Sequence, residues 1–259
     1  MDVNLYDFWP APAKLNLMLR IVGRRPDGRI NRVNELSGVP EESDLVVRAA
    51  KLLKRSCATA LGVDIYLNKM LPMGAGLGGG SSDAATTLIV LNRLWQSGKS
   101  ENQLAQLGLR LGADVPVFIR GRSSWGEGVG EKLEPIELPC PWYLILLPPC
   151  HVSTAEIFSD PDLTRNSPRI RIRDFLAGSV QNDCLSVVCG RYPSVREAMQ
   201  WLERYSTPRL TGTGAAVFAP FDDEELARRV QKKVPALYQS FVARGVNRSP
   251  LGCDLGMER

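Results

Sequence analysis

The stretch Pro72-Met73-Gly74-Ala75-Gly76-Leu77-Gly78-Gly79-Gly80-Ser81-Ser82-Asp83-Ala84-Ala85 decides the fold of this chain. Five glycines fall within seven residues, and a run of good helix formers follows, from Ala84 to Trp95. Glycine permits positive φ angles and lets a ligand approach the main chain closely. A helix that starts directly after such a loop presents N–H groups and the positive end of its dipole. The stretch therefore predicts an anion-binding loop, and we expect the anion to be a nucleotide phosphate.

The loop differs from two common nucleotide-binding motifs. A Walker loop needs Gly-Lys-Ser/Thr, but no lysine lies between Lys69 and Lys99. The G-x-G-x-x-G spacing of a dinucleotide fingerprint is present from Gly74 to Gly79, yet Pro72 stands where the preceding strand should still run. A flexible glycine hinge is the simplest alternative. It is disfavoured because the run leads straight into a helix with an apolar face.

The composition is that of an ordinary globular protein. The chain has 259 residues, which suits one large domain or two ordinary ones, with 44% apolar and 23% charged residues. A net charge of +4 is compatible with a phosphorylated substrate but does not require a polyanionic partner. No apolar run is long enough to span a membrane, and the N-terminus lacks the pattern of a signal peptide. We therefore expect a cytoplasmic protein with no membrane or nucleic-acid partner.

The cysteines and the histidine argue against several catalytic classes. Six cysteines are scattered without a C-x-x-C pair, as is typical of reduced thiols in a cytoplasm. His151 is the only histidine, so a multi-histidine metal site is excluded, and a Ser-His-Asp or Cys-His site would depend on this one residue. It follows Pro148-Pro149-Cys150, which is typical of a turn at a strand end. RNA binding is an alternative raised by Arg169, Arg171 and Arg173, but the interleaved aromatic residues of single-strand binders are absent.

Strand-like runs and helical periodicity are mixed along the chain. The sequence predicts strands at 15–22, 63–67, 142–147 and 241–246, and helices at 44–54, 84–95, 103–111, 195–205 and 222–233. Asp44 is expected to cap the first of these helices. Because no strict strand–helix–strand repeat is present, the predicted class is α+β. A boundary near Pro148-Pro149 predicts an N-terminal domain at 1–147 and a C-terminal domain at 148–259.

Three further blocks contain residues that could carry chemistry. Lys14 and Asn16 lie beside a predicted strand, where a lysine is most often a solvated edge residue. Asp114 stands between the helix-ending Gly112 and a strand-like apolar run, and such an aspartate is often only a helix cap. The block Leu210–Phe218 contains two glycines, which indicate either a tight β-turn or a close backbone approach. In isolation, none of these blocks establishes a function.

The glycine run resembles the phosphate loop of the small-molecule kinases related to galactokinase, homoserine kinase, mevalonate kinase and phosphomevalonate kinase. Their ATP-binding loop reads Pro-x-x-x-Gly-Leu-Gly-Ser/Gly-Ser-Ser without a lysine, and Pro72 through Ser82 follow this pattern. The resemblance implies a two-domain α+β kinase fold with mixed sheets and packed helices, an N-terminal ATP-binding domain, and an active site in the cleft between the domains. It also implies ATP and Mg²⁺ as cofactors. The implied ATP-binding residues are Pro72, Met73, Gly74, Ala75, Gly76, Leu77, Gly78, Gly79, Gly80, Ser81 and Ser82.

Other blocks are similar to one family of this superfamily, the kinases of 4-diphosphocytidyl-2-C-methyl-D-erythritol. They are Pro12–Leu17, Gly23–Gly28, Leu111–Phe118, Glu127–Glu131, Asn182-Asp183, Leu210–Phe218 and Gly245–Pro250. The resemblance implies that Asp114 is catalytic and accepts the substrate hydroxyl proton, while Lys14 neutralises charge on the transferred phosphoryl group. It implies that Asn16 and Asp114 bind the substrate, a cytidine diphosphate-linked alcohol. The 2-hydroxyl of that alcohol would be phosphorylated in non-mevalonate isoprenoid precursor biosynthesis, and no protein metal ligand is assigned.

The chain departs from this family after Gly28. There the family continues with Tyr-His and a few tens of residues that include strands, whereas here Arg29-Ile30-Asn31-Arg32 follow. In the family, that histidine and nearby aromatic residues help to hold the cytosine ring. The resemblance therefore leaves two alternatives beside the main interpretation. One is an impaired or non-catalytic nucleotide-binding relative, and the other is a kinase of the same superfamily with a different substrate.

Overall fold

The computed structural model describes residues 7–9, 19–25, 30–32, 34, 39–69, 74–128, 132–168, 171–176 and 182–251. These residues form two compact units. The first is built from described residues within Met1–Pro72, Gly78–Glu137 and Arg248–Arg259, and the second from those within Met73–Leu77 and Leu138–Asn247. Each unit has its own sheet, its own helices and its own apolar core.

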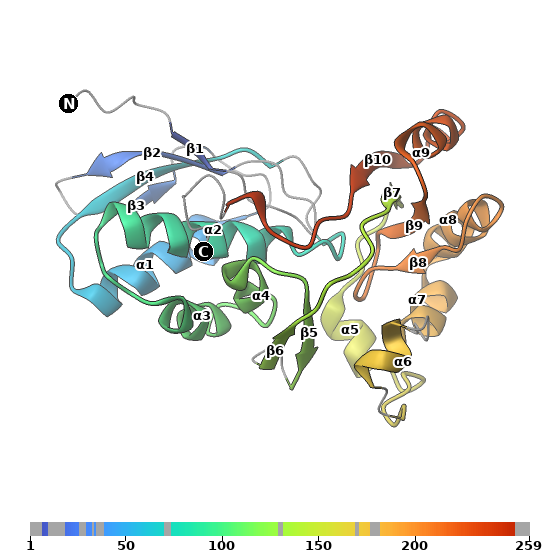
Figure 1. Ribbon diagram of the computed structural model, residues 1–259, viewed down its shortest axis with the longest axis horizontal. Coiled ribbons are helices and arrows are strands. Elements are labelled where there is room, and N and C mark those ends of the chain that lie inside the picture. The colour runs from blue at the N-terminus through green and yellow to red at the C-terminus, as the bar shows by residue number, and fades with distance from the viewer. Residues whose placement is uncertain are drawn as a thin grey trace. The chain divides into compact units, whose positions relative to one another are not determined.

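A four-stranded mixed sheet forms one layer of the first unit (Figure 1). Its strands, in spatial order, are β1 (Asp7–Trp9), β2 (Leu19–Arg25), β4 (Gly62–Leu67) and β3 (Ile30–Arg32). Only the pair β3–β4 is parallel. The β4 side chains Val63, Ile65 and Leu67 are buried at alternate positions, as expected for a strand with one face on the core. The predicted strand at 15–22 is found from Leu19 onward, and its earlier residues lie outside the described part of the chain.

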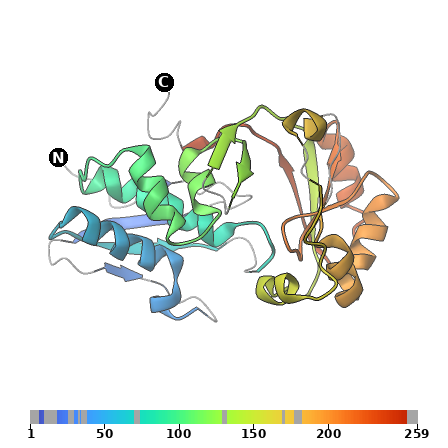
Figure 2. The same ribbon diagram turned by 90° about the horizontal axis from the view of Figure 1, so that it is seen from below.

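Helices cover one face of this sheet (Figures 1 and 2). They are η1 (Glu41–Ser43), α1 (Leu45–Cys57), α2 (Gly79–Leu94), α3 (Glu101–Leu109) and α4 (Val115–Arg120), and a hairpin of β5 (Ser124–Glu127) and β6 (Lys132–Pro135) follows. Asp44 caps α1 as predicted, because its Oδ1 accepts a hydrogen bond from the Val46 amide at 2.8 Å. Helix α2 is buried at ten consecutive positions, from Ser82 to Leu91. A helix buried on all sides must be the centre of its unit.

The apolar run after Asp114 is the helix α4, so the expectation of a strand-like segment there is wrong. Valine and isoleucine favour strands only where a pleated surface is available to them. Here they pack against α3, and a Cβ on Gly108 of that helix would lie only 2.7 Å from Val115 Cγ1 and Ile119 Cδ1. This close packing outweighs the local preference. Gly121 then ends the helix with a φ of 60°.

The described residues of the second unit form an antiparallel sheet and five helices. Its strands, in spatial order, are β10 (Gln239–Arg244), β7 (Trp142–Leu147), β9 (Val217–Phe221) and β8 (Arg209–Leu210). Its helices are α5 (Thr154–Ser159), α6 (Ile172–Leu176), α7 (Leu185–Arg191), α8 (Pro193–Glu203) and α9 (Glu224–Gln231). Helices α8 and α9 pack against the sheet, and α7 packs against α8 (Figures 1 and 2). No helix in the described ranges has both the length and the apolar composition needed to cross a membrane.

The α+β class with mixed sheets and packed helices is confirmed. The two units differ in extent from the ranges 1–147 and 148–259 that the sequence suggested. Strand β7 is the reason, since it lies between β9 and β10 and hydrogen-bonds with both, inside the second sheet. The described end of the chain also returns to the first unit, where Leu251 is buried in the core.

Shortening a side chain inside α2 should destabilise the first unit. Leu88 is 0% exposed, so Leu88→Ala should lower the free energy of unfolding by about 2–5 kcal/mol through lost burial and a residual cavity. Leu94→Ala removes the same atoms from a half-buried position at the end of the same helix and should cost clearly less. Urea denaturation followed by circular dichroism measures both. Equal losses for the two variants would contradict the central place of α2.

Candidate active site

The glycine loop turns directly into the start of α2. Gly76 and Gly78 have φ angles of 71° and 69°, which side-chain-bearing residues rarely adopt. Gly78 occupies the N-cap position of α2, where no side chain makes a capping hydrogen bond. The helix start therefore keeps its amides on the loop side without a competing side-chain oxygen at the cap. This is the local geometry expected of an anion-binding loop.

The predicted nucleotide-binding residues fall into three groups. Ala75 and Leu77 are each 7% exposed and anchor the loop, whereas Gly74 is exposed. Gly79, Gly80, Ser81 and Ser82 form the first turn of α2. Ser81 is half-buried, but Ser82 is fully buried and its amide donates to the Gly78 carbonyl at 2.9 Å. Pro72 and Met73 lie outside the described residues.

The block Leu210–Phe218 contacts the glycine loop within the second unit. The Thr211 hydroxyl donates to the Gly76 carbonyl at 3.0 Å, and the Ala216 amide donates to the Ala75 carbonyl at 3.1 Å. A Cβ on Gly76 would lie 2.6 Å from the carbonyl oxygens of both Thr211 and Gly214. Only glycine fits at this contact. Close backbone approach, rather than a mere β-turn, therefore explains the small residues of this block.

Asn182 holds the same block in place. Its side-chain amide donates to the carbonyls of Leu210 at 3.0 Å and Gly212 at 2.8 Å, and its Oδ1 accepts from the Cys184 amide at 2.9 Å. The sequence singled out Asn182 only by resemblance. Burial, with a smaller contribution from the negative charge of Asp183, raises the pKa of the neighbouring Cys184 thiol. A thiol with a raised pKa is a poor nucleophile, so Cys184 is a structural residue here.

Asp114 lies in a segment that reaches the start of α2. A Cβ on Gly112 would be 3.8 Å from Ser81 Oγ, although the two residues belong to separate sequence blocks. Asp114 is exposed and occupies the N-cap position of α4, yet its side chain makes no capping hydrogen bond. Asp44 and Asp223 do cap their helices, at 2.8 and 2.7 Å from the amides that they bind. Helix capping therefore does not account for an aspartate at position 114.

Two other predicted site residues, Lys14 and Asn16, lie outside the described residues, so their roles stay predictions. His151, which was expected only to lie at a turn, contacts the glycine loop. A Cβ on Gly74 would lie 2.4 Å from His151 Nδ1, so the imidazole ring packs directly on the loop glycine. The ring is exposed. No local sequence signal pointed to this contact, because it joins residues far apart in the chain.

Lys69 and Asp83 form an ion pair that sequence reasoning missed. Lys69 Nζ donates to Asp83 Oδ2, and the side chains are 23% and 2% exposed. The pair spans the glycine loop, since Lys69 precedes it and Asp83 lies in the second turn of α2. The signal was present in the sequence as the last lysine before the loop and the first acid after it. Their pairing could be recognised only once the strand and the helix were placed side by side.

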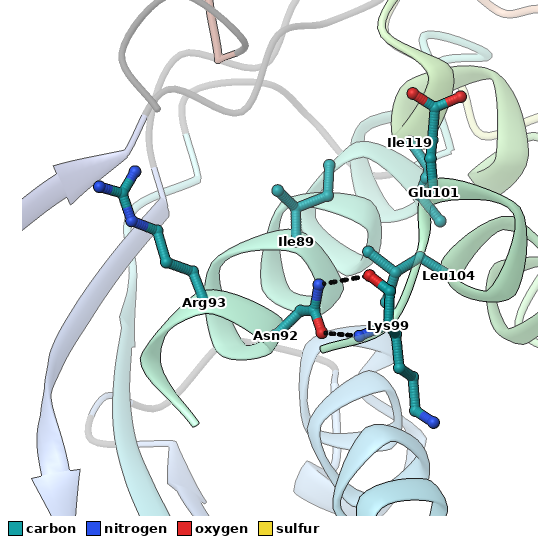
Figure 3. Close-up of a pocket in the computed structure, with 7 residues that line it drawn as sticks. All are labelled: Ile89, Asn92, Arg93, Lys99, Glu101, Leu104 and Ile119. Carbon is teal, nitrogen blue, oxygen red and sulfur yellow. Dashed lines mark hydrogen bonds between the residues drawn. The ribbon is translucent and has the colours of Figure 1, made fainter. Parts of the chain in front are cut away.

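A separate pocket lies at the other end of α2 (Figure 3). It has a volume of about 270 Å³ and is lined by Ile89, Asn92, Arg93, Lys99, Glu101, Leu104 and Ile119. Its polar side chains are engaged within the protein: Asn92 bonds the Lys99 backbone at 2.9 and 3.0 Å, and Glu101 pairs with Arg120 at 2.6 Å. These contacts leave the pocket without a convergent set of polar groups. The glycine loop is therefore the better candidate site.

Comparison with known proteins identifies the family to which the chain belongs. Family models described as GHMP kinases N terminal domain and GHMP kinases C terminal match residues 44–122 and 182–240. A 4-diphosphocytidyl-2-C-methyl-D-erythritol kinase of Methylococcus capsulatus is 54% identical over 268 residues, covering 93% of this chain and 92% of that protein. A protein of the same name from Nitrosococcus oceani is 51% identical, covering 94% and 96%.

Solved structures show the same relationship. A crystal structure of 4-(cytidine 5'-diphospho)-2C-methyl-D-erythritol kinase matches with a TM-score of 0.74 and 27% identity, covering 93% of this chain and 88% of that one. A homoserine kinase from Cytophaga hutchinsonii matches with a TM-score of 0.62 at 17% identity, over 91% and 88%, and supports the fold alone. The chain therefore belongs to the GHMP kinases and, within them, to the family of 4-diphosphocytidyl-2-C-methyl-D-erythritol kinases.

Proposed function

We propose that this protein is an ATP-dependent kinase that phosphorylates the 2-hydroxyl of 4-diphosphocytidyl-2-C-methyl-D-erythritol. The observation that carries the proposal is the proximity of Gly112 to Ser81, which brings the segment of the proposed catalytic Asp114 to the start of α2. Identity of 54% to a kinase of that name supports the choice of substrate. The reaction belongs to isoprenoid precursor biosynthesis, and a cytoplasmic location stays a prediction.

The chain's own residues fit the phosphates of ATP. Gly74 is exposed, and the start of α2, where Gly78 is the N-cap, presents the positive end of the helix dipole. A lysine is not needed in such a loop, because several oriented N–H groups can hold a phosphate together. Pro72 and Met73 complete the proposed nucleotide-binding set, Pro72–Ser82.

Asp114 would act on the substrate hydroxyl. Phosphoryl transfer depends mainly on positioning and on charge stabilisation, so the carboxylate need only orient the hydroxyl and accept its proton as the bond forms. A carboxylate is a much weaker base than an alkoxide, so we expect the proton to be transferred late, after the bond to phosphorus has begun to form. Lys14 would balance the negative charge near Asp114, and Asn16 would bind the substrate. Both roles are proposals drawn from the family resemblance.

Mg²⁺ fits the same arrangement. Bound together with ATP, it would offset the negative charge of the phosphates and would need only one or two protein oxygen ligands. Ser81, in the first turn of α2, is a described residue whose hydroxyl could supply such a ligand. In the part of the chain that the structure describes, no cluster of three or more possible metal-ligating side chains is present. A metal held mostly by the nucleotide is consistent with that donor set.

The proposal is tested by assaying the full-length protein with ATP and the diphosphocytidyl alcohol. ADP release and phosphorus NMR of the product are the readouts, and homoserine and mevalonate serve as comparison substrates. We expect turnover of the diphosphocytidyl alcohol alone. Preferred turnover of homoserine or mevalonate would assign the chain to a different activity of the superfamily.

Replacing the proposed base should abolish most turnover while sparing nucleotide binding. Asp114→Asn should reduce kcat by about 100- to 10,000-fold, the range for loss of general-base catalysis, because the amide cannot accept the proton. Steady-state kinetics measures kcat, and calorimetry should find the ATP affinity changed by less than about threefold. Asp223→Asn is the control, since it alters an aspartate that truly caps a helix, α9. Near-normal kcat in Asp114→Asn would refute the assignment.

Filling the contact beneath the loop should weaken ATP binding. In Gly76→Ala the new methyl group would meet two carbonyl oxygens at 2.6 Å, which forces the loop away from Thr211 and Gly214. We expect at least about a tenfold loss in ATP affinity, or 1.4 kcal/mol, measured by calorimetry. Gly98→Ala is a matched control, because Gly98 has a φ of 65° but no atom within 4 Å of its Cβ position. If Gly76→Ala binds ATP as tightly as Gly98→Ala does, the contact of Gly76 with Thr211 and Gly214 does not govern ATP binding.

We expect this chain to bind the alcohol substrate weakly, because it lacks a segment that its relatives have. The alignment with the Methylococcus capsulatus protein runs over 268 residues but covers only 93% of these 259, so a few tens of aligned positions have no counterpart here. We expect this gap to follow Gly28, which lies outside the described residues. Inserting the relative's segment there should lower the KM for the alcohol roughly 10- to 100-fold, the equivalent of one aromatic stacking contact with the base.

A glycine–serine insert of equal length is the control for this experiment. It should leave the KM for the alcohol high, and neither insert should change the KM for ATP by more than about threefold. A KM for the alcohol that is already as low as that of the Methylococcus capsulatus kinase would show that the segment is dispensable.

A further inference from the structure

We propose that Lys69 and Asp83 are a positioning pair that holds the phosphate loop in its nucleotide-binding conformation. The inference rests on the proposed ATP binding by this loop. The pair is a hydrogen-bonded ion pair between Lys69 Nζ and Asp83 Oδ2. Both residues belong to the first unit, and in the sequence they stand on either side of the loop. Its role is to fix the two ends of the loop relative to each other.

Each partner belongs to a rigid element. Lys69 lies two residues beyond β4, and the end of that strand is fixed by Asn34, whose side chain bonds both the amide and the carbonyl of Leu67 at 2.9 and 2.8 Å. Asp83 lies in the second turn of α2, which is buried from Ser82 to Leu91. The pair therefore ties an anchored strand end to a buried helix.

Because Asp83 is buried, its carboxylate depends on pairing with Lys69. The Asp83 side chain is 2% exposed, and a carboxylate at such a position needs a cation and hydrogen bonds to remain charged. Lys69 is 23% exposed and brings its charge to the carboxylate from the solvent side. The two residues are fourteen positions apart, and the proposed ATP-binding residues lie between them. By joining the two ends of this segment, the ion pair limits the conformations of the loop. Nucleotide binding then costs less conformational entropy.

Lys69 could act in two ways, by positioning the loop or by binding the phosphates directly, and the contact with Asp83 favours the first. Lys69 is the last lysine before the loop, so it could in principle serve as the phosphate-binding lysine that the loop lacks. Its ammonium is instead bound by the Asp83 carboxylate, which offsets its charge. The two roles predict opposite effects of removing Asp83. Releasing a phosphate-binding lysine would strengthen nucleotide binding, whereas releasing the loop would weaken it.

The test compares Lys69→Met, Asp83→Asn and the double variant in the full-length protein. Isothermal calorimetry with ADP and with a non-hydrolysable ATP analogue gives the dissociation constants, and thermal denaturation gives the melting temperatures. We expect each single variant to raise the dissociation constant about tenfold, or 1.4 kcal/mol. The double variant should bind no more weakly than the weaker single variant, since the two residues act as one unit. The KM for the alcohol should change by less than about threefold.

Two controls distinguish positioning from a general loss of stability. Asp160→Asn removes a second buried carboxylate, 4% exposed and paired with Arg191 in the other unit. It should lower the melting temperature but leave nucleotide affinity within about twofold of the unaltered protein. Lys69→Arg keeps the charge and the hydrogen bond, so its nucleotide affinity should be within about threefold of that of the unaltered protein. If Lys69→Met fails to fold, the comparison of Asp83→Asn with Lys69→Arg still tests the proposal.

Several results would overturn the proposal. Tighter or unchanged nucleotide binding by Asp83→Asn would assign Lys69 to the phosphates or the pair to stability alone. An equal loss of affinity in Asp160→Asn would show that any buried carboxylate has the same effect. The proposed function fails separately: if the unaltered protein binds no nucleotide, the ATP assignment is wrong, whereas unaltered binding in all variants rejects only the positioning role.

Discussion

The burial of helix α2 is the constraint on which the first unit depends. Ten consecutive residues, Ser82 to Leu91, are buried, so the helix has no solvent face along most of its length. It packs against α1, α3 and α4, and each of these contacts limits its direction. Because the helix cannot rotate or shift, the point where it begins is fixed. Gly78, the N-cap residue at which the glycine loop ends, therefore has a fixed position within the first unit.

Close backbone approach determines where the loop can go. At Gly76 the backbone is within hydrogen-bonding reach of the Thr211 side chain, and a methyl group there would collide with two carbonyl oxygens. At Gly112 the segment that leads to Asp114 reaches Ser81. Asn182 then holds the Leu210–Phe218 block from its other side. The glycine at position 76 lets the main chain approach the carbonyl oxygens of Thr211 and Gly214 without a side chain between them.

Local signals predicted much of the secondary structure. The Asp44 cap, the strand at Trp142–Leu147 and the helix that follows the glycine loop depend on neighbouring residues and were recognised correctly. Helix α4 was missed because its valines and isoleucine favour strands, and only its packing against Gly108 explains a helix. The assignment of β7 to the second sheet was missed as well. Its partners, β9 and β10, lie far along the chain and leave no local trace.

The sequence by itself determined the glycine loop that leads into a helix, the α+β class and the family, because glycine spacing, periodicity and motif order are properties of contiguous residues. Only the tertiary structure decided that Asp114 does not cap its helix, that His151 lies on Gly74, and that Lys69 pairs with Asp83. The two contacts join residues that are separated along the chain. Such contacts follow from the way a buried helix and a sheet pack together, and packing is a property of the whole fold that no single stretch of sequence contains.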